Sequence, residues 1–286
     1  MENKGIIIKP LRKRRSKMES YAEIAVGVYP EFADKRAEEE RELRNKLKSY
    51  VVRNDGELIG DVYKVEYMSQ LYNEIMKFGE NMDEVDLIIE YFYKYTDEEL
   101  EKAKMFWLNP TRSYIQSKDY NDYPCDTCGR RILTDVDIIK VGKKVKGGRP
   151  RKMFKFGAGI EELLCVSVDL YNYFLDNGVN SEDFRPVYCG KEMQGYAFTP
   201  IEEYDIRSSV YEYRICESCG REYALYDIPK GYHPEKFELR SPIDFSAHDV
   251  YKTKVYYDRE QRILISPKLF KLMKNYIKDN EYKAIF

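Results

Sequence analysis

The residues best suited to chemistry in this chain are two pairs of cysteines, each within a C-x-x-C-G-R motif. Cys125 and Cys128 form the first pair, and Cys216 and Cys219 form the second. The motifs match at four of six positions, and both differences keep the chemistry, acid for acid and hydroxyl for hydroxyl. A C-x-x-C loop lets two thiolates converge on one cation, and the glycine after it tolerates the left-handed backbone of a tight turn. Two such loops supply the four sulfur ligands of a closed tetrahedral Zn²⁺ site.

The sequence therefore predicts one structural zinc, with no open coordination position for catalysis. Two other interpretations stay open. A C-x-x-C pair can be a redox dithiol, although redox motifs open a helix and here Gly-Arg follows each pair. The four thiols can also form disulfides, which are rarer in cytosolic proteins. The 87 residues between Cys128 and Cys216 exceed the roughly 12 to 20 of a simple zinc ribbon, so a shared metal requires a folded segment between them.

A second repeated pattern indicates that the C-terminal half is duplicated. Residues 163–174 and 262–273 each run from an apolar stretch into a serine and then into apolar residues at helical spacing. Ser167 and Ser266 are placed as helix N-caps in the two copies. We expect each copy to contain a cysteine loop, a hairpin, a strand and a short helix. Such a duplication would bring the cysteine loops together about a pseudo-twofold axis.

The N-terminal part has helix and strand patterns of its own. Residues 31–50 and 67–78 have apolar residues at helical spacing, and residues 85–95 alternate as in a strand. Thr96-Asp97-Glu98-Glu99 is typical of a capping box and predicts a helix that continues to about Trp107.

The predicted fold class is α+β, with a helix and strand region followed by a duplicated, β-rich, zinc-ribbon-like unit with short helices. The expected divisions are a basic flexible tail over residues 1–20, an N-terminal α+β region over residues 21–115, and the double C-x-x-C domain over residues 116–286, with pseudo-repeats at about 125–187 and 216–286.

The composition predicts a cytoplasmic protein that does not enter a membrane. Hydrophobic residues make up 43% of the 286 residues, enough for a core, and the net charge of −2 gives no global field for nucleic acid. No run of about 18 apolar residues occurs, and the first residues lack the apolar region of a secretory signal. Thiols stay reduced in the cytoplasm, which favours metal binding over disulfides.

The chain resembles the double-CXXCG motif proteins of bacteria, some of which are immunity proteins that protect a cell from its own contact-delivered toxins. The resemblance covers about residues 85–286. It implies a binding protein that neutralises a cognate protein toxin, with zinc fixing the scaffold and an acidic or tyrosine-rich surface making the contact. The residues that carry it are the two C-x-x-C-G-R motifs and residues 95–103, 184–187 and 265–269.

A basic stretch supports an alternative function. Residues 140–155 contain eight cations and no acid, and Gly148-Arg149-Pro150-Arg151-Lys152 resembles an AT-hook, whose arginines enter the minor groove of A·T tracts. The arginine usually found before the glycine is Gly147 here. In this alternative, the protein is a zinc-ribbon nucleic-acid-binding protein that uses residues 147–152. The other interpretation is the solvated tip of a hairpin that joins strands over residues 136–141 and 152–156.

The sequence gives little support for an enzyme. Only two histidines occur, and no phosphate-binding glycine loop, H-E-x-x-H or G-x-S-x-G motif is present. Cys165 lies in an apolar stretch and is expected in the core, and Cys189 is expected to be a half-buried thiol. We therefore expect a binding protein rather than a catalyst.

Overall fold

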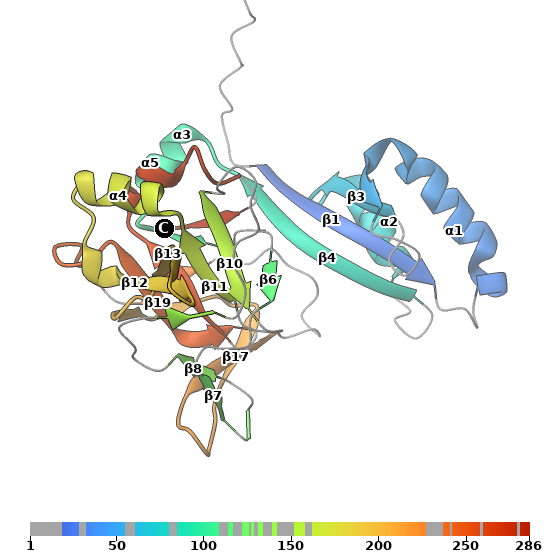
Figure 1. The fold of residues 1–286 in the computed structure, drawn as a ribbon. Helices are drawn as coiled ribbons and strands as arrows, with labels where there is room; N and C mark the ends of the chain where they lie inside the picture. The colour runs from blue at the N-terminus through green and yellow to red at the C-terminus, as the bar shows by residue number, and fades with distance from the viewer. Residues whose placement is uncertain are drawn as a thin grey trace, which may run out of the picture.

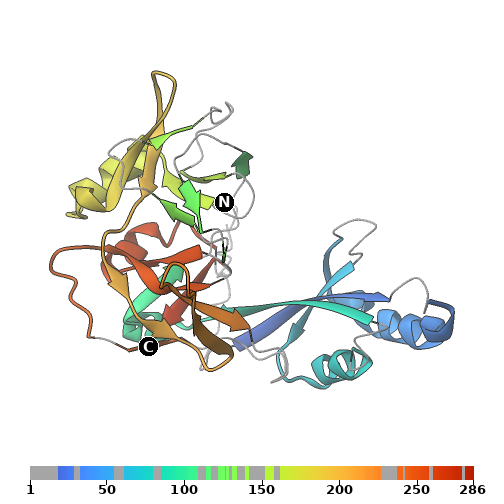
Figure 2. The same ribbon diagram turned by 90° about the horizontal axis from the view of Figure 1, so that it is seen from below.

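The structure is a computed structural model, and its described residues form two parts. Figure 1 shows a small N-terminal lobe, in blue and teal, that projects from a larger body. Figure 2, the view from below, shows the same separation, with long strands leading from the lobe toward the body. The described residues are 19–28, 33–54, 61–79, 85–108, 114–116, 122–125, 127–128, 131–133, 139–141, 152–157, 162–226, 237–240, 242–257, 260–278 and 281–286.

The N-terminal lobe is a four-stranded antiparallel sheet with two helices on one face. Its elements follow in the order β-α-β-β-α-β, and the strand order β2-β3-β1-β4 is that of a split β-α-β unit. They are β1 (Glu19–Val28), α1 (Ala33–Leu47), the 3₁₀ turn η2 (Lys48–Tyr50), β2 (Val51–Asn54), β3 (Asp61–Glu66), α2 (Gln70–Phe78) and β4 (Val85–Lys94).

Local sequence accounts for the elements of the lobe. Alternate residues of β1, including Ile24, point toward the helices and are buried with Leu47 of α1 and Ile75 of α2. Helix α2 begins after Ser69, whose hydroxyl accepts a hydrogen bond from the third helical N–H, and it ends at Gly79. The strand expected over residues 85–95 is confirmed as β4, which pairs with β1 along all ten residues.

The chain enters the body earlier than the expected boundary at residue 115. The capping box at Thr96 is confirmed, but α3 (Asp97–Lys102) ends before the predicted limit at Trp107. Residues 105–108 instead form β5 (Met105–Leu108), which pairs with two strands near the C-terminus. All four β5 side chains are buried, and a short apolar run buried on both faces has no periodicity that distinguishes strand from helix.

The body contains two large sheets, and buried side chains of helices α4 and α5 share one core with strands of both sheets. Figure 1 shows these helices at the top of the body, near α3. The strand orders are β6-β10-β11-β13-β12-β9 and β16-β17-β19-β20-β5-β21, with β14 beside β19. The first-sheet elements and η3 are β6 (Tyr114–Gln116), β9 (Ile139–Lys140), β10 (Met153–Gly157), β11 (Glu162–Val166), α4 (Val168–Asp176), η3 (Ser181–Asp183), β12 (Phe184–Cys189) and β13 (Glu192–Phe198). The others are β14 (Glu203–Tyr204), β16 (Tyr211–Ile215), β17 (Glu222–Tyr226), β19 (Val250–Tyr257), β20 (Glu260–Ile265), α5 (Pro267–Met273) and β21 (Tyr282–Ile285), with the separate pair β15 (Ile206–Arg207) and β18 (Glu238–Leu239).

The two sheets share four strand pairings: β10–β11, β11–β13, β12–β13 and β6–β10 in the first correspond to β19–β20, β5–β20, β5–β21 and β14–β19 in the second. We call residues 105–189 the first half of the body and residues 192–285 the second half. Each half has an antiparallel hairpin, β10–β11 or β19–β20, that leads into a short helix. The predicted N-caps are confirmed, because the hydroxyls of Ser167 and Ser266 each accept a hydrogen bond from the backbone N–H three residues later. The mixture of helices and strands confirms the α+β class.

Each half places its first strand in the sheet of the other half. Strand β13 of the second half lies between β11 and β12, and strand β5 of the first half lies between β20 and β21. The registers correspond, since Cys165 lies opposite Ala197 in one sheet and Leu264 lies opposite Trp107 in the other. The halves are therefore intertwined, and neither sheet is complete without a strand from the other half.

The hairpin expected between residues 136–141 and 152–156 is not present. Strand β9 pairs in parallel with β12, and β10 pairs with β11 and β6, so three strands separate β9 from β10 in the sheet. The hairpin was expected because the two strands follow each other in the sequence. In the structure, β9 pairs instead with β12, a strand more than 40 residues away. The segment between these strands, residues 142–151, lies outside the described residues.

Candidate metal centre

The four cysteines of the two C-x-x-C loops lie together. Their Sγ atoms are all within 4.8 Å of one another. The Sγ atoms of Cys125 and Cys216 are 4.0 Å apart, and those of Cys128 and Cys219 are 3.8 Å apart. Metal–sulfur bonds of about 2.3 Å in a tetrahedron place the sulfurs about 3.8 Å apart, whereas a disulfide holds them at about 2.05 Å. All six cysteines are free thiols, so the spacing fits one cation among four sulfurs.

Two short hairpins hold the cysteine loops. Strands β7 (Asp122–Pro124) and β8 (Arg131–Leu133) pair on either side of the first loop, and β16 and β17 do so for the second. The last strand pairs are Pro124 with Arg131 and Ile215 with Glu222. Each loop thus spans the same six positions between paired strand ends, and the two loops contribute their cysteines in the same way.

The backbone of the second loop is a tight turn. The Gly220 N–H donates a hydrogen bond of 2.8 Å to the Cys216 carbonyl, and the Cys216 N–H donates one of 2.9 Å to the Arg221 carbonyl. Gly220 has φ +68°, in the left-handed region where a side chain is disfavoured. The predicted role of the glycine is therefore confirmed in this loop, and Gly129 of the first loop lies outside the described residues.

The two loops also contact each other outside the cluster. The hydroxyls of Thr127 and Ser218 share a hydrogen bond, and both side chains are exposed. Cys216 is only 4% exposed, while the other three cysteines of the cluster are partly buried. The sulfur cluster therefore lies close to the surface, and the hydroxyl contact between the loops is more exposed than the cysteines.

The two thiols of the second loop have pKa values shifted in opposite directions. Backbone N–H groups, first that of Cys219 and then that of Ser218, lower the pKa of Cys216 despite its desolvation. At Cys219 the backbone N–H of Arg221 lowers the pKa, but desolvation and the neighbouring thiols outweigh it and raise the pKa to about 11. Four sulfurs this close cannot all be thiolates unless a cation offsets their repulsion. A bound divalent metal removes this conflict, because coordinated thiols are deprotonated.

The other predicted site residues do not join this cluster. Lys152 lies just before β10, where its Nζ is 3.2 Å from a carboxylate oxygen of Asp169. Arg149 and Arg151 lie outside the described residues. Cys165 is fully buried in the core as expected, and burial raises the pKa of its thiol well above the ordinary value. Cys189 is half-buried as expected. In the described part of the chain, the four loop cysteines form the one group of three or more metal-ligating side chains that converge.

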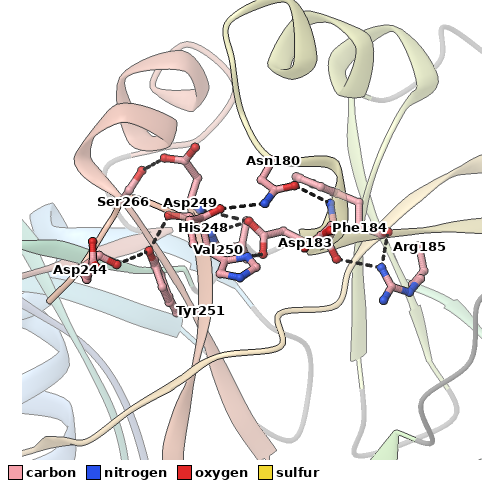
Figure 3. Close-up of polar contacts among 12 residues, drawn as sticks. Asn180, Asp183, Phe184, Arg185, Asp244, His248, Asp249, Val250, Tyr251 and Ser266 are labelled. Atoms are coloured by element: carbon pink, nitrogen blue, oxygen red, sulfur yellow. Dashed lines mark hydrogen bonds and ion pairs between the residues drawn. The ribbon is translucent and has the colours of Figure 1, made fainter.

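A buried polar network joins the two halves, and the sequence did not indicate it (Figure 3). Asp183 of η3 is completely buried and accepts hydrogen bonds from the N–H groups of Asp249 and Val250, at 3.0 and 3.2 Å. Its other oxygen lies 2.8 Å from Nδ1 of His248. Burial raises the pKa of Asp183, and these three contacts oppose the rise. Because 65 residues separate the acid from the histidine, no local pattern marks the pair.

Comparisons with protein-family models, with curated proteins and with solved structures found no match to this chain. Within the described residues, none of the helices has the length and apolar character needed to cross a membrane. The geometry of the cysteine cluster is therefore the main basis for a functional proposal.

Proposed function

We propose that this protein is a zinc-clamped binding protein, in which the four loop cysteines hold one structural Zn²⁺. The observation that carries the proposal is the convergence of four sulfur atoms within 4.8 Å of one another. A tetrahedral set of four thiolates favours Zn²⁺ among common divalent ions, with iron as the other usual occupant. All four positions are then filled by protein, so the metal stabilises the fold and has no site for substrate.

We also infer that the two halves are copies of one zinc-ribbon-like unit, with repeats at about residues 125–187 and 216–286. The corresponding strand pairings and serine caps support this inference. So does the constant separation of 91 residues between Cys125 and Cys216 and between Cys128 and Cys219. In this arrangement each copy supplies two ligands, and the strands that precede the copies, β5 and β13, are each exchanged into the sheet of the other half.

For the cellular role, we propose a cytoplasmic immunity protein that binds and neutralises a cognate protein toxin. The resemblance of the C-x-x-C-G-R motifs to the double-CXXCG proteins supports this role. A metal without an open position also favours action through the protein surface rather than through catalysis. The chain contains 27 tyrosines, a residue that supplies large contact area at low entropic cost.

Metal analysis of the full-length protein tests the zinc site. We expect one zinc per chain in protein purified under reducing conditions without added metal, and none in a C125S/C216S double variant. Two zinc ions per chain would mean that each loop recruits other ligands. Iron, or no metal, would contradict the proposal directly.

Co-expression tests the cellular role. If a secreted toxin is encoded beside this gene, the full-length protein should restore growth of cells that express the toxin and should co-purify with it. Growth that stays inhibited while both proteins are expressed would contradict the immunity role.

A salt-dependent gel shift with an A·T-rich duplex would instead favour the nucleic-acid alternative. The pairing of Lys152 with Asp169 gives that alternative less support.

A further inference from the structure

Arg221, which follows the second cysteine loop, has a buried donor without an acceptor. Its Nη1 atom is buried and has no hydrogen-bond partner among the residues that the structure describes. Its guanidinium carbon lies 5.7 Å from the centre of the Tyr256 ring. The backbone of Arg221 closes the loop by accepting the hydrogen bond from Cys216. A buried guanidinium N–H without an acceptor is unfavourable, so the charge must be compensated in another way.

Tyr256 connects the arginine to the cysteine cluster. It lies on β19 opposite Tyr223 of β17, the strand that follows the second loop, and it is 6% exposed. Burial raises the pKa of Tyr256, the charge of Arg221 lowers it, and the Glu203 carboxylate, followed by the thiols of Cys219 and Cys128, raises it. The phenol is therefore within electrostatic reach of both the guanidinium and one sulfur from each loop. Arg221 follows Cys219 by two residues and accepts the Cys216 N–H at its carbonyl, so its backbone is anchored at the cysteine loop while its guanidinium lies against the buried ring.

The charge of the proposed centre requires a nearby cation. Four thiolates around a divalent metal carry a net charge of −2, and such a charge is costly at a partly buried site unless an opposite charge lies close by. We propose that Arg221 is the counter-cation of the metal–thiolate centre, a positioning residue that retains the metal without binding it. This inference rests on the proposed zinc site. It assigns to the last residue of the second C-x-x-C-G-R motif a role in holding zinc.

Zinc release from the full-length protein tests this role. The variants are R221M and R221Q, which remove the charge, and R221K, which keeps it. The control is R214M, because Arg214 on β16 is 55% exposed and its guanidinium pairs with Glu212 on the same strand. The readout is the rate of zinc transfer to a colorimetric chelator, measured beside the melting temperature of each zinc-loaded variant.

We expect R221M and R221Q to release zinc about 10- to 100-fold faster than the wild type, the usual effect of removing a residue that supports metal ligands. R221K keeps the charge but not the stacking of the planar guanidinium on Tyr256, so it should release zinc faster than the wild type but more slowly than either uncharged variant. R214M should match the wild type. Wild-type release rates in both uncharged variants would overturn the inference. Equally fast release from R221K would also overturn it, because packing rather than charge would then be responsible. A wild-type protein that binds no zinc would instead contradict the proposed function.

Discussion

Each half of the body links its hairpin to its helix by one ion pair, and the two pairs have opposite polarity. In the first half, Lys152 just before β10 pairs with Asp169 of α4 at 3.2 Å. In the second half, Asp249 stands before β19 and pairs with Lys268 of α5 at 3.0 Å. The acid and the base have changed places, while the backbone N–H of each capping serine donates to the carbonyl of the residue before the hairpin in both halves. The two halves therefore share the pairing at this position but not the sign of either charge.

The two pairs differ in their surroundings. The side chains of Lys152 and Asp169 are 42% and 71% exposed, so their attraction is screened by water. The Asp249 side chain is only 7% exposed, and it also accepts a hydrogen bond from the Ser266 hydroxyl. Lys268 donates in addition to the Gly178 carbonyl at 2.6 Å, which ties α5 to the end of α4. The second pair thus belongs to the interface between the halves, whereas the first lies on the surface.

Removing a single cysteine ligand, from either half, gives the largest expected effect. Because one shared metal depends on both loops, C125S and C219S should both lose zinc and should be destabilised to a similar degree, by about 5 kcal/mol or more. The melting temperature should fall by roughly 10 to 20 °C. Zinc content and thermal unfolding provide the measurements, with C189S as the control outside the cluster. A C125S protein that keeps a full equivalent of zinc would show that the halves do not share the metal.

The exchanged strands provide the second test, because only one of them has a glycine among the matched positions. Strand β13 has Gly195 where β5 has Met105. A Cβ at Gly195 would lie 2.3 Å from the Val166 carbonyl oxygen, and the glycine has φ +150°. We expect G195A to cost about 3 kcal/mol, from the overlap and the backbone together. The control is G190A, because Gly190 has φ +61° but open space around its Cβ, and about 1 kcal/mol is expected there.

Denaturant unfolding of both glycine variants measures the difference. If G195A were no less stable than G190A, the close approach between β13 and β11 would not be a constraint on the exchanged strand.

The network in Figure 3 provides the third test, because there the two halves are joined by hydrogen bonds to one buried side chain, Asp183, rather than by the cysteine cluster. D183N keeps the shape but has one acceptor oxygen in place of two, so the N–H groups at the start of β19 and Nδ1 of His248 can no longer both face a carboxylate oxygen, which should cost about 2 to 3 kcal/mol. The comparison is N180A, since Asn180 also reaches the second half, at the Ala247 carbonyl, but is exposed there. About 1 kcal/mol is expected for N180A, because Asn180 also caps η3 by accepting a hydrogen bond from the Glu182 N–H. Equal effects in urea unfolding would show that burial of Asp183 does not matter.

Sequence patterns predicted the local features of this molecule but not how the strands pair. The cysteine cluster was predictable because both loops repeat a motif whose chemistry requires convergence. The serine caps and the capping box were predictable because each hydrogen bond spans three residues. The exchange of β5 and β13 was not, because short buried strands specify neither their partners nor their register. Likewise, the helix predicted to reach Trp107 became a strand once β20 and β21 provided partners for it.

The smallest expected effect comes from giving the first half the polarity of the second. In K152D/D169K the acid precedes the hairpin and the base lies on the helix, as with Asp249 and Lys268. Because the pair is exposed, the double variant should stay within about 0.5 kcal/mol of the wild type. K152D alone places two acids together and should be less stable than the double variant by a similar small amount. A thermodynamic cycle from urea unfolding measures the coupling, and a large loss in the double variant would mean that the sign of the charge matters at this position in the first half.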